Sequence, residues 1–166
     1  MDKSQRAVAS AMLNKKSSKD RPEWDEYFMN IAKVVSSRGS CIRRQVGCVL
    51  INSRNQIIAT GYNGKARGLI HCFDDPCKGA YSSSGTKLGD CSAIHAEANA
   101  LLQCSDVYNI HKAYITTAPC VDCTKLFLNT SCEEIVYLEE YPHSQSKEMW
   151  ENDDRIWTHF KGDGNA

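Results

Sequence analysis

The chain has 166 residues, a length typical of one domain with a full hydrophobic core. Its 20 lysines and arginines balance its 20 aspartates and glutamates, so the formal net charge at pH 7 is zero. A protein that grips a long polyanion usually carries a basic surplus, so this balance favours a small-molecule ligand over a nucleic acid.

Nine cysteines are many for this length, and the cellular compartment decides how they are interpreted. The first ten residues, MDKSQRAVAS, contain no apolar stretch long enough for a signal peptide or a membrane span. Without an export signal, cysteines are expected to be reduced, buried or metal-binding rather than paired in disulfides. The sequence therefore predicts a cytoplasmic protein with no membrane association.

The first part of the chain predicts an extension followed by a helix. Residues 1–20 include a polar run and are expected to form a polar N-terminal extension, with a single domain over residues 21–166. Pro22 suits a helix start, and the helix is expected to end near Gly39. Its apolar stripe at helical spacing consists of Trp24, Phe28, Ile31 and Val35.

Two strands are predicted next, over residues 46–51 and 56–62. The polar residues between them favour a turn, so the strands should form an antiparallel hairpin. The run Gly61-Tyr62-Asn63-Gly64 closes the second strand. It is either a turn alone or a place where an asparagine holds a sugar hydroxyl, and the motif does not decide between the two.

A long segment without helical or strand periodicity follows, over residues 65–91. Connections of this length in a compact domain are usually functional, tied down or disordered. Four cysteines lie in or near it and are candidates for a second, closed zinc site. They are Cys41, Cys72, Cys77 and Cys91. Unbound reduced thiols are an equally good interpretation of this cluster.

The remaining pattern alternates helices and strands. Helices are expected over residues 94–104, 121–129 and 147–152, and strands over residues 113–117, 134–138 and 156–160. In the first of these helices Ala98, Leu101 and Leu102 are expected to face inward, and in the second Leu126 and Phe127 are apolar. A strand, a helix and a strand with short links predict a parallel pair joined by a right-handed crossover. The helices that begin after residues 95 and 120 would then start at one edge of the sheet, where α/β folds bind ligands.

Two short motifs at these helix starts point to a catalytic zinc site. His95, Cys120 and Cys123 supply one imidazole and two thiolates, which leaves a fourth position open for water. Cys120 and Cys123 are three apart, so both sulfurs project to one side of a helix that begins after Pro119. A helix N-terminus also favours the thiolate form that a metal requires.

Glu97 is assigned to catalysis rather than to metal binding. It lies two positions after His95 and so faces another way around a helix, beside the water of the metal rather than on the metal. A carboxylate bound to zinc could not move protons, whereas an unbound one can take and return them. The pair H-x-E with P-C-x-x-C is the pattern of zinc-dependent nucleobase deaminases. A lone C-x-x-C would be weak evidence, since redox pairs and structural zinc sites share it.

With these motifs in place, residues 21–142 resemble the deoxycytidylate (dCMP) deaminase family, closest to its bacterial and phage branch. The matching stretches are RPEWDEYF from Arg21, CIRRQVG from Cys41, GYNG from Gly61, His71-Cys72, HAEANA from His95 and PCVDC from Pro119. Cys48 departs from the small alanine usual after Val-Gly, which is a change in packing. The loop cysteines differ from the histidine and glutamate ligands of a second zinc in some phage relatives.

The resemblance implies a cytidine-deaminase-like α/β fold, a three-layer α/β/α sandwich around a five-stranded mixed sheet. It implies zinc-dependent hydrolysis of dCMP to dUMP and ammonia, which supplies dUMP for thymidylate synthesis. It also implies a homohexamer activated by dCTP and inhibited by dTTP, with Mg²⁺ accompanying a triphosphate effector. By the same resemblance Gly61, Tyr62 and Gly64 belong near the effector site. The residues implied to contact substrate are Asn63 at the sugar and Arg44 and Tyr141 at the phosphate.

Two kinds of alternative remain open from the sequence. Within the same chemistry, the substrate could be free cytidine, a tRNA adenosine or a riboflavin precursor. The neutral charge disfavours tRNA, and the GYNG run with the cysteine loop disfavours the free-nucleoside enzymes. From another class, a zinc-binding module without catalysis is possible. An intact Glu97 disfavours that interpretation, because a structural zinc site has no use for an unligated carboxylate there.

Overall fold

A computed structural model describes residues 21–83, 86–142 and 144–162 of the chain. The predicted extension over residues 1–20 lies outside the described residues. The described part contains four α-helices: α2 (Trp24–Ser36), α3 (Ala96–Gln103), α4 (Val121–Leu128) and α5 (Gln145–Glu151). In that part, no helix has the length and apolar character needed to span a bilayer.

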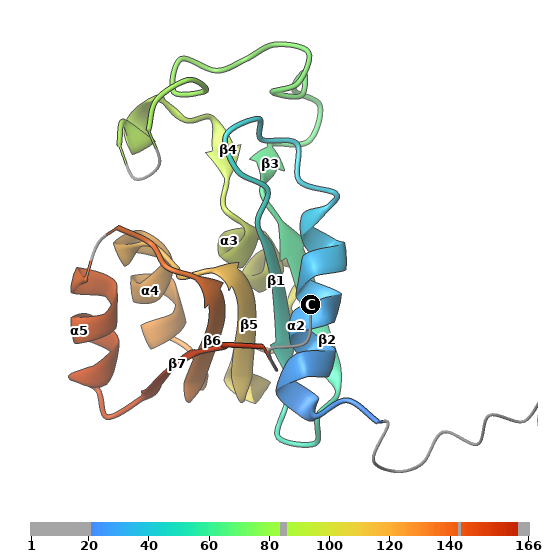
Figure 1. Ribbon diagram of the computed structural model, residues 1–166, viewed down its shortest axis with the longest axis vertical. Helices are drawn as coiled ribbons and strands as arrows, with labels where there is room; N and C mark the ends of the chain where they lie inside the picture. The colour runs from blue at the N-terminus through green and yellow to red at the C-terminus, as the bar shows by residue number, and fades with distance from the viewer. Residues whose placement is uncertain (1–20, 84–85, 143, 163–166) are drawn as a thin grey trace, which may run out of the picture.

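A five-stranded mixed sheet forms the middle layer (Figure 1). Its strands are β1 (Gly47–Ile51), β2 (Ile57–Tyr62), β5 (Lys112–Thr117), β6 (Glu134–Glu139) and β7 (Ile156–His159), in the order β2-β1-β5-β6-β7. β1 pairs antiparallel with both β2 and β5, whereas β5–β6 and β6–β7 are parallel. The predicted hairpin and the predicted parallel pair are both confirmed.

Helices cover both faces of the sheet, as the predicted three-layer sandwich requires. The face under α2 is built on Phe28, Met29 and Ala32, which pack against alternate residues of β1, β5 and β6. The opposite face carries α3, α4 and α5, with Phe127 and Trp150 among its buried side chains. Because successive strand residues point to opposite faces, β1 is buried along its whole length between the two cores.

Helix periodicity predicted the buried faces only in part. Phe28 is buried, but Trp24 is 46% exposed, and Met29 and Ala32 take its place in the core. In α3 the inward residues are Ala96 and Ala100, whereas Leu102 is 77% exposed. The predicted stripes were therefore partly wrong. Helix α2 turns Met29 and Ala32 toward the sheet beside Phe28, and α3 rests on β2 along Ala96 and Ala100, which allow close approach.

The long segment predicted to lack regular structure forms a separate lobe above the sheet (Figure 1). Two short strands, β3 (Gly64–Lys65) and β4 (Ala93–Ile94), pair antiparallel and form its neck. The side chain of Lys65 is mostly buried and binds Asp75, with Nζ 2.6 Å from the backbone oxygen and 3.2 Å from Oδ2. The neck therefore holds the lobe close to the starts of α3 and β1.

Candidate active site

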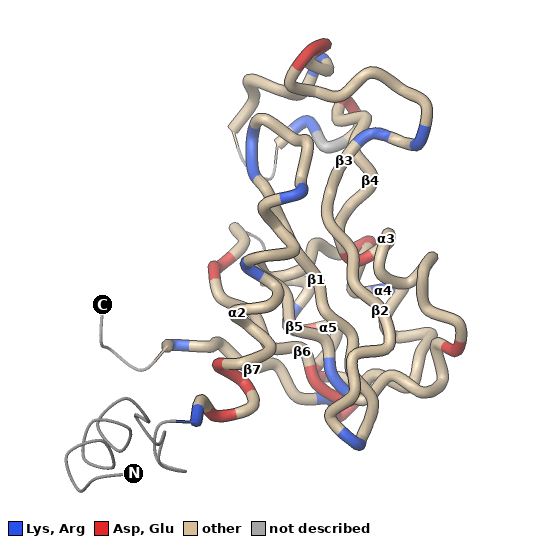
Figure 2. Tube along the Cα trace, turned by 90° about the vertical axis from the view of Figure 1, so that its right-hand side faces the viewer, with Lys and Arg blue, Asp and Glu red and all other residues tan. Residues whose placement is uncertain are grey.

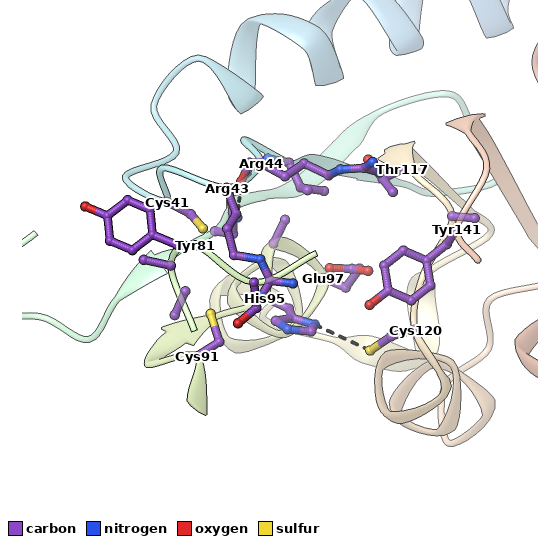
Figure 3. Close-up of a pocket in the computed structure, with 17 residues that line it drawn as sticks. Cys41, Arg43, Arg44, Tyr81, Cys91, His95, Glu97, Thr117, Cys120 and Tyr141 are labelled. Atoms are coloured by element: carbon purple, nitrogen blue, oxygen red, sulfur yellow. Dashed lines mark hydrogen bonds between the residues drawn. The ribbon is translucent and has the colours of Figure 1, made fainter. Parts of the chain in front are cut away.

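Three potential metal ligands meet where α3 and α4 begin. His95 is the N-cap residue of α3, Cys120 is the N-cap residue of α4, and Cys123 lies in the first turn of α4. The Nδ1 atom of His95 lies 3.4 Å from the Sγ atoms of both cysteines (Figure 3 shows the contact with Cys120). In the described part of the chain this is the one trio of histidine, cysteine and acidic residues whose ligand atoms all lie within 4.8 Å of one another.

The local sequence explains why both sulfurs point the same way. Pro119 directly precedes Cys120, whose extended backbone then enters α4. The carbonyl of Cys120 accepts from both the backbone N–H and the hydroxyl of Thr124, at 2.9 Å and 3.0 Å. With the first turn fixed in this way, the i and i+3 sulfurs share one side of the helix.

The protonation of the cysteines fits a site built for a cation. Hydrogen bonds from Cys123 and then His95 lower the pKa of Cys120 to about 4. The same contact with Cys120, followed by burial, raises the pKa of Cys123 well above its usual value. The hydrogen bond to Cys120 also raises the pKa of His95. Two buried thiols that compete for one negative charge, beside an imidazole, form a donor set that suits Zn²⁺.

Glu97 lies next to this group, in the first turn of α3, and its carboxylate faces the cavity (Figure 3). Only 4% of the residue is exposed. Desolvation raises the pKa of the carboxyl to about 7. A carboxyl with that pKa can both accept and return a proton near neutral pH, which general acid–base catalysis requires.

A cavity of about 300 Å³ opens in front of the trio and Glu97. This volume is at the lower end of the range for small-molecule sites. The loop before β1, the ends of β2 and β5, the lobe and the segment after β6 all contribute to its walls (Figure 3). Ala80, Tyr81 and Ser82 line the cavity from the lobe, as Cys91 does, and Thr117 lines it from β5. Sequence reasoning missed the first three because a wall made by an irregular segment has no periodic signal. It missed Thr117 because no local signal shows which strand end faces the cavity.

Asn63 has a structural task in addition to its place in the cavity wall. Its Oδ1 accepts from the backbone N–H of Val46 at 2.8 Å, and its Nδ2 donates to the carbonyl of Arg44 at 2.7 Å. The side chain therefore joins the end of β2 to the segment that enters β1. One amide hydrogen and one lone pair of the side chain remain for a ligand.

Two arginines line the cavity with different partners. Nη1 of Arg44 lies 3.3 Å from Oγ1 of Thr117 and 3.4 Å from a carboxylate oxygen of Glu139. Arg43 instead donates to backbone carbonyls of the lobe, at 2.7 Å for Ser83 and 3.3 Å for Thr86. Tyr141 lines the same cavity, and burial raises the pKa of its hydroxyl. A cationic wall thus faces the cavity from the loop before β1.

The GYNG run is shaped by packing. A Cβ atom on Gly61 would lie 2.2 Å from the carbonyl oxygen of Ala96 and 2.3 Å from the nitrogen of Ala100. The close contact of α3 with β2 therefore requires a glycine at this position. Tyr62 is 38% exposed, and its carbonyl accepts from Asn99 at 2.8 Å. A Cβ on Gly64 would lie 2.6 Å from Oγ of Ser40. Of this run, Asn63 alone lines the cavity.

The four loop cysteines are only partly gathered. The Sγ atoms of Cys72 and Cys77 lie 3.9 Å apart, and neither residue lines the cavity. Cys41 and Cys91 do line it, and burial, with Cys41 and Cys77 as weaker causes, raises the pKa of Cys91. No three of these four sulfurs lie within 4.8 Å of one another, whereas the ligand atoms of His95, Cys120 and Cys123 do.

Comparison with known proteins shows to which family the chain belongs. A family model described as "Cytidine and deoxycytidylate deaminase zinc-binding region" matches residues 22–139. The chain is 39% identical over 123 residues to the deoxycytidylate deaminase of Saccharomyces cerevisiae, which covers 73% of this chain and 39% of the yeast protein. It is 40% identical over 129 residues to the deoxycytidylate deaminase of Mycobacterium phage D29, which covers 72% of this chain and 98% of the phage protein.

The fold also has solved neighbours. The cyanophage S-TIM5 dCMP deaminase, crystallised in complex with dCMP and dUMP, aligns with a TM-score of 0.70 at 24% identity, over 84% of this chain and 98% of that one. At this identity the likeness shows the fold. The chain spans about two fifths of the length of the yeast relative and nearly the whole length of the phage one.

Proposed function

This chain belongs to the cytidine and deoxycytidylate deaminase family with its zinc-binding region, and from that premise we propose that it hydrolyses dCMP to dUMP and ammonia. The observation that carries the proposal is the joint placement of two thiol groups and an imidazole beside a buried, unligated carboxylate at the base of a small cavity. The yeast and phage relatives are both deoxycytidylate deaminases, which supports dCMP as the substrate.

The proposed chemistry assigns each residue one task. His95, Cys120 and Cys123 would hold the metal, and zinc bound there would supply a cation that lowers the pKa of a water molecule. Glu97 would take a proton from the attacking water and deliver it to N3 as the water oxygen bonds to C4 of the cytosine ring. Glu97 would then move the second proton from the new hydroxyl at C4 to the exocyclic amine, so that the C4–N bond breaks, ammonia leaves and a C4 carbonyl remains.

The rest of the substrate would contact the far wall of the cavity. Asn63 is assigned to the sugar, for which it has one amide hydrogen left. Arg44 and Tyr141 are assigned to the 5′-phosphate. A guanidinium suits a phosphate because its planar fork donates two parallel hydrogen bonds. Arg44 would have to loosen its contact with Glu139, so Arg43 is the alternative phosphate ligand within the same wall.

An assay with four substrates tests the proposal. Purified protein is offered dCMP, CMP, deoxycytidine and cytidine, each with and without dCTP and dTTP. We expect dCMP to have the highest kcat/KM, with activation by dCTP and inhibition by dTTP. Preference for CMP, deoxycytidine or cytidine would replace dCMP as the substrate. No activity on any of them, with zinc bound, would support a zinc-binding module without catalysis.

We propose further properties that follow from family membership. Regulation by dCTP and dTTP, with Mg²⁺ on the triphosphate, is assigned to the neighbourhood of Gly61, Tyr62 and Gly64, and the assembly is proposed to be a homohexamer in the cytoplasm. The matched residues 22–139 support a single deaminase domain over residues 21–166 with residues 1–20 as an extension. Basic and acidic positions are interspersed along the described trace, in keeping with a small nucleotide ligand rather than a nucleic acid or membrane (Figure 2).

A second, structural Zn²⁺ at Cys41, Cys72, Cys77 and Cys91 is part of the proposal. The short Cys72–Cys77 distance supports it, since two of the four sulfurs are already adjacent. Metal analysis should give two zinc ions per chain, falling to one in Cys72→Ser. Cys104→Ser is the matched control, because Cys104 lies at the end of α3, outside both clusters. One zinc per chain, unchanged by Cys72→Ser, would remove the second site.

A further inference from the structure

One arginine near the end of the chain, Arg155, forms hydrogen bonds to the end of α4, the helix that carries Cys120 and Cys123. Arg155 lies just before β7, beyond the residues 22–139 that match the family model. Its guanidinium donates to four backbone carbonyls at the C-terminal end of α4 and in the turn after it. The distances are 3.2 Å to Phe127, 3.2 Å to Thr130 and 2.9 Å to Cys132 from Nη1, and 3.0 Å to Leu128 from Nη2.

The guanidinium is itself held from two further sides. Nε binds Oδ2 of Asp153 at 2.7 Å, and the group lies over the ring of Trp150, 5.0 Å from its centroid. Trp150 is fully buried, and its Nε1 donates to the carbonyl of Ile156 at 2.9 Å. The side chain of Arg155 is only 19% exposed. The plane of the guanidinium is therefore fixed by α5 and by the turn that follows it, rather than by solvent.

This contact matters because α4 is short. It has eight residues, and helices of that length are marginal unless tertiary contacts hold them. The last carbonyls of a helix have no partner within it, and a cation there also interacts favourably with the helix dipole. Arg155 satisfies both needs at one end of α4, while Cys120 and Cys123 lie at the other end. If the C-terminal end of α4 tilted or frayed, the sulfurs of Cys120 and Cys123 would be displaced together.

We propose that Arg155 is a positioning residue for the zinc site, and that it fixes α4 so that Cys120 and Cys123 stay in ligating geometry. The inference rests on the proposed zinc site. It gives α5 and β7, which follow the matched family region, a task in metal retention.

Zinc release to a chromogenic chelator tests the inference without relying on activity. In Arg155→Met, which keeps an apolar stem over Trp150 but removes every donor, zinc release should be at least about tenfold faster than in wild type, the lower end of the effect seen for residues that support metal ligands. Arg155→Lys keeps the charge without the planar fork, so its rate of zinc release should lie between those of wild type and Arg155→Met.

A control separates positioning from general loss of stability. Thr158→Val lies on the same strand, β7, and removes one hydrogen bond, from Oγ1 to Glu134 at 2.7 Å, which does not involve α4. Its zinc release should stay within about twofold of wild type, while its midpoint in urea falls.

Equal release from Arg155→Met and Thr158→Val would overturn the inference. If Arg155→Met does not fold, Arg155→Lys decides, and release at the wild-type rate overturns the inference. A wild-type protein that holds no zinc would overturn the zinc site and this inference together, whereas normal retention in every Arg155 variant overturns this inference alone.

Discussion

At the scale of residues, the burial of Glu97 is the feature on which the proposed chemistry depends. A carboxylate removed from water is unstable in its charged form, and here desolvation raises its pKa to about 7. Glu97 shares the buried part of α3 with Ala96 and Ala100, so its immediate neighbours on the helix are apolar. A group whose two protonation states are nearly balanced is suited to moving protons in both directions.

Replacing Glu97 by glutamine should abolish most of the activity. Glutamine keeps the shape but cannot accept the proton, so kcat on dCMP should fall by about 10²–10⁴. Zinc content should be unchanged, because Glu97 is not among the three clustered ligands. Steady-state kinetics and metal analysis check both points, with Glu133→Gln, an exposed carboxylate paired with His111, as control. Activity within about tenfold of wild type would contradict the assigned role.

Removing Arg44 should weaken the use of dCMP but spare deoxycytidine. If the guanidinium binds the phosphate, Arg44→Ala should lower kcat/KM for dCMP. The loss should correspond to about 1.5–3 kcal/mol of transition-state stabilisation, the range for hydrogen bonds to charged groups. Deoxycytidine has no phosphate to lose, so its slow reaction should barely change. Arg54→Ala, in the turn between β1 and β2, is the control. Equal losses on both substrates would make Arg44 structural and move the phosphate contact to Arg43.

Residue types and spacing predicted which potential ligands lie together, but not the walls of the cavity. The ligand atoms of His95, Cys120 and Cys123 do cluster, because one imidazole and two thiols at two helix starts admit few arrangements. The partners of Arg44 could not be predicted from the sequence. They are Thr117 and Glu139, which lie side by side only because β5 and β6 pair in parallel.

At the scale of elements, the close contact between β2 and α3 requires a glycine at position 61. Gly61→Ala would place a Cβ within 2.3 Å of the backbone of α3, which cannot yield as a flexible side chain would. We expect a loss of about 1–3 kcal/mol in the free energy of unfolding, typical of overpacking. Activity should fall as well, because α3 carries Glu97 and follows His95. Urea unfolding and kinetics measure both.

Gly89→Ala is the matched control for that substitution. A Cβ at Gly89 would meet nothing within 4 Å, so its free energy of unfolding should change by no more than about 0.5 kcal/mol. If Gly61→Ala were as stable as Gly89→Ala, α3 would not rest on β2 as closely as described.

The elements themselves were predictable because their signals are local. The five strands of the sheet and α3, α4 and α5 lie within two residues of their expected bounds, and α2 ends before Gly39 as a C-terminal signal predicts. β3 and β4 were missed, because two-residue strands leave no period to detect. The exposed Trp24 was also missed: a wide aromatic residue at helical spacing fits a core pattern, yet it stacks on Phe28 at the rim of α2.

At the scale of the whole molecule, removal of the metal should loosen the structure. The three proposed ligands come from two helices, so bound zinc ties α3 to α4 in the native state only. Zinc in free excess of 1,000 times its dissociation constant stabilises by about 4 kcal/mol. At about 2–4 °C per kcal/mol, a chelator should lower Tm by roughly 8–16 °C. Calorimetry with and without chelator, and after zinc is added back, checks this value. An unchanged Tm in metal-free protein would contradict the site.

The order of the strands also implies an order of events during folding. β1 and β2 are joined by a short turn, and β5, β6 and β7 by single helices, so each group can form from contacts that are near in sequence. The pairing of Cys48 with Ile115 across β1 and β5 is different, because the whole lobe must be closed as a loop first. We expect this docking to be the slow step. His95 lies before the group β5, β6 and β7, whereas Cys120 and Cys123 lie inside it. A nascent chain would therefore expose the thiols of Cys120 and Cys123, without their histidine partner, until the two groups have docked. The rate of this docking would set how long these thiols stay open to oxidation.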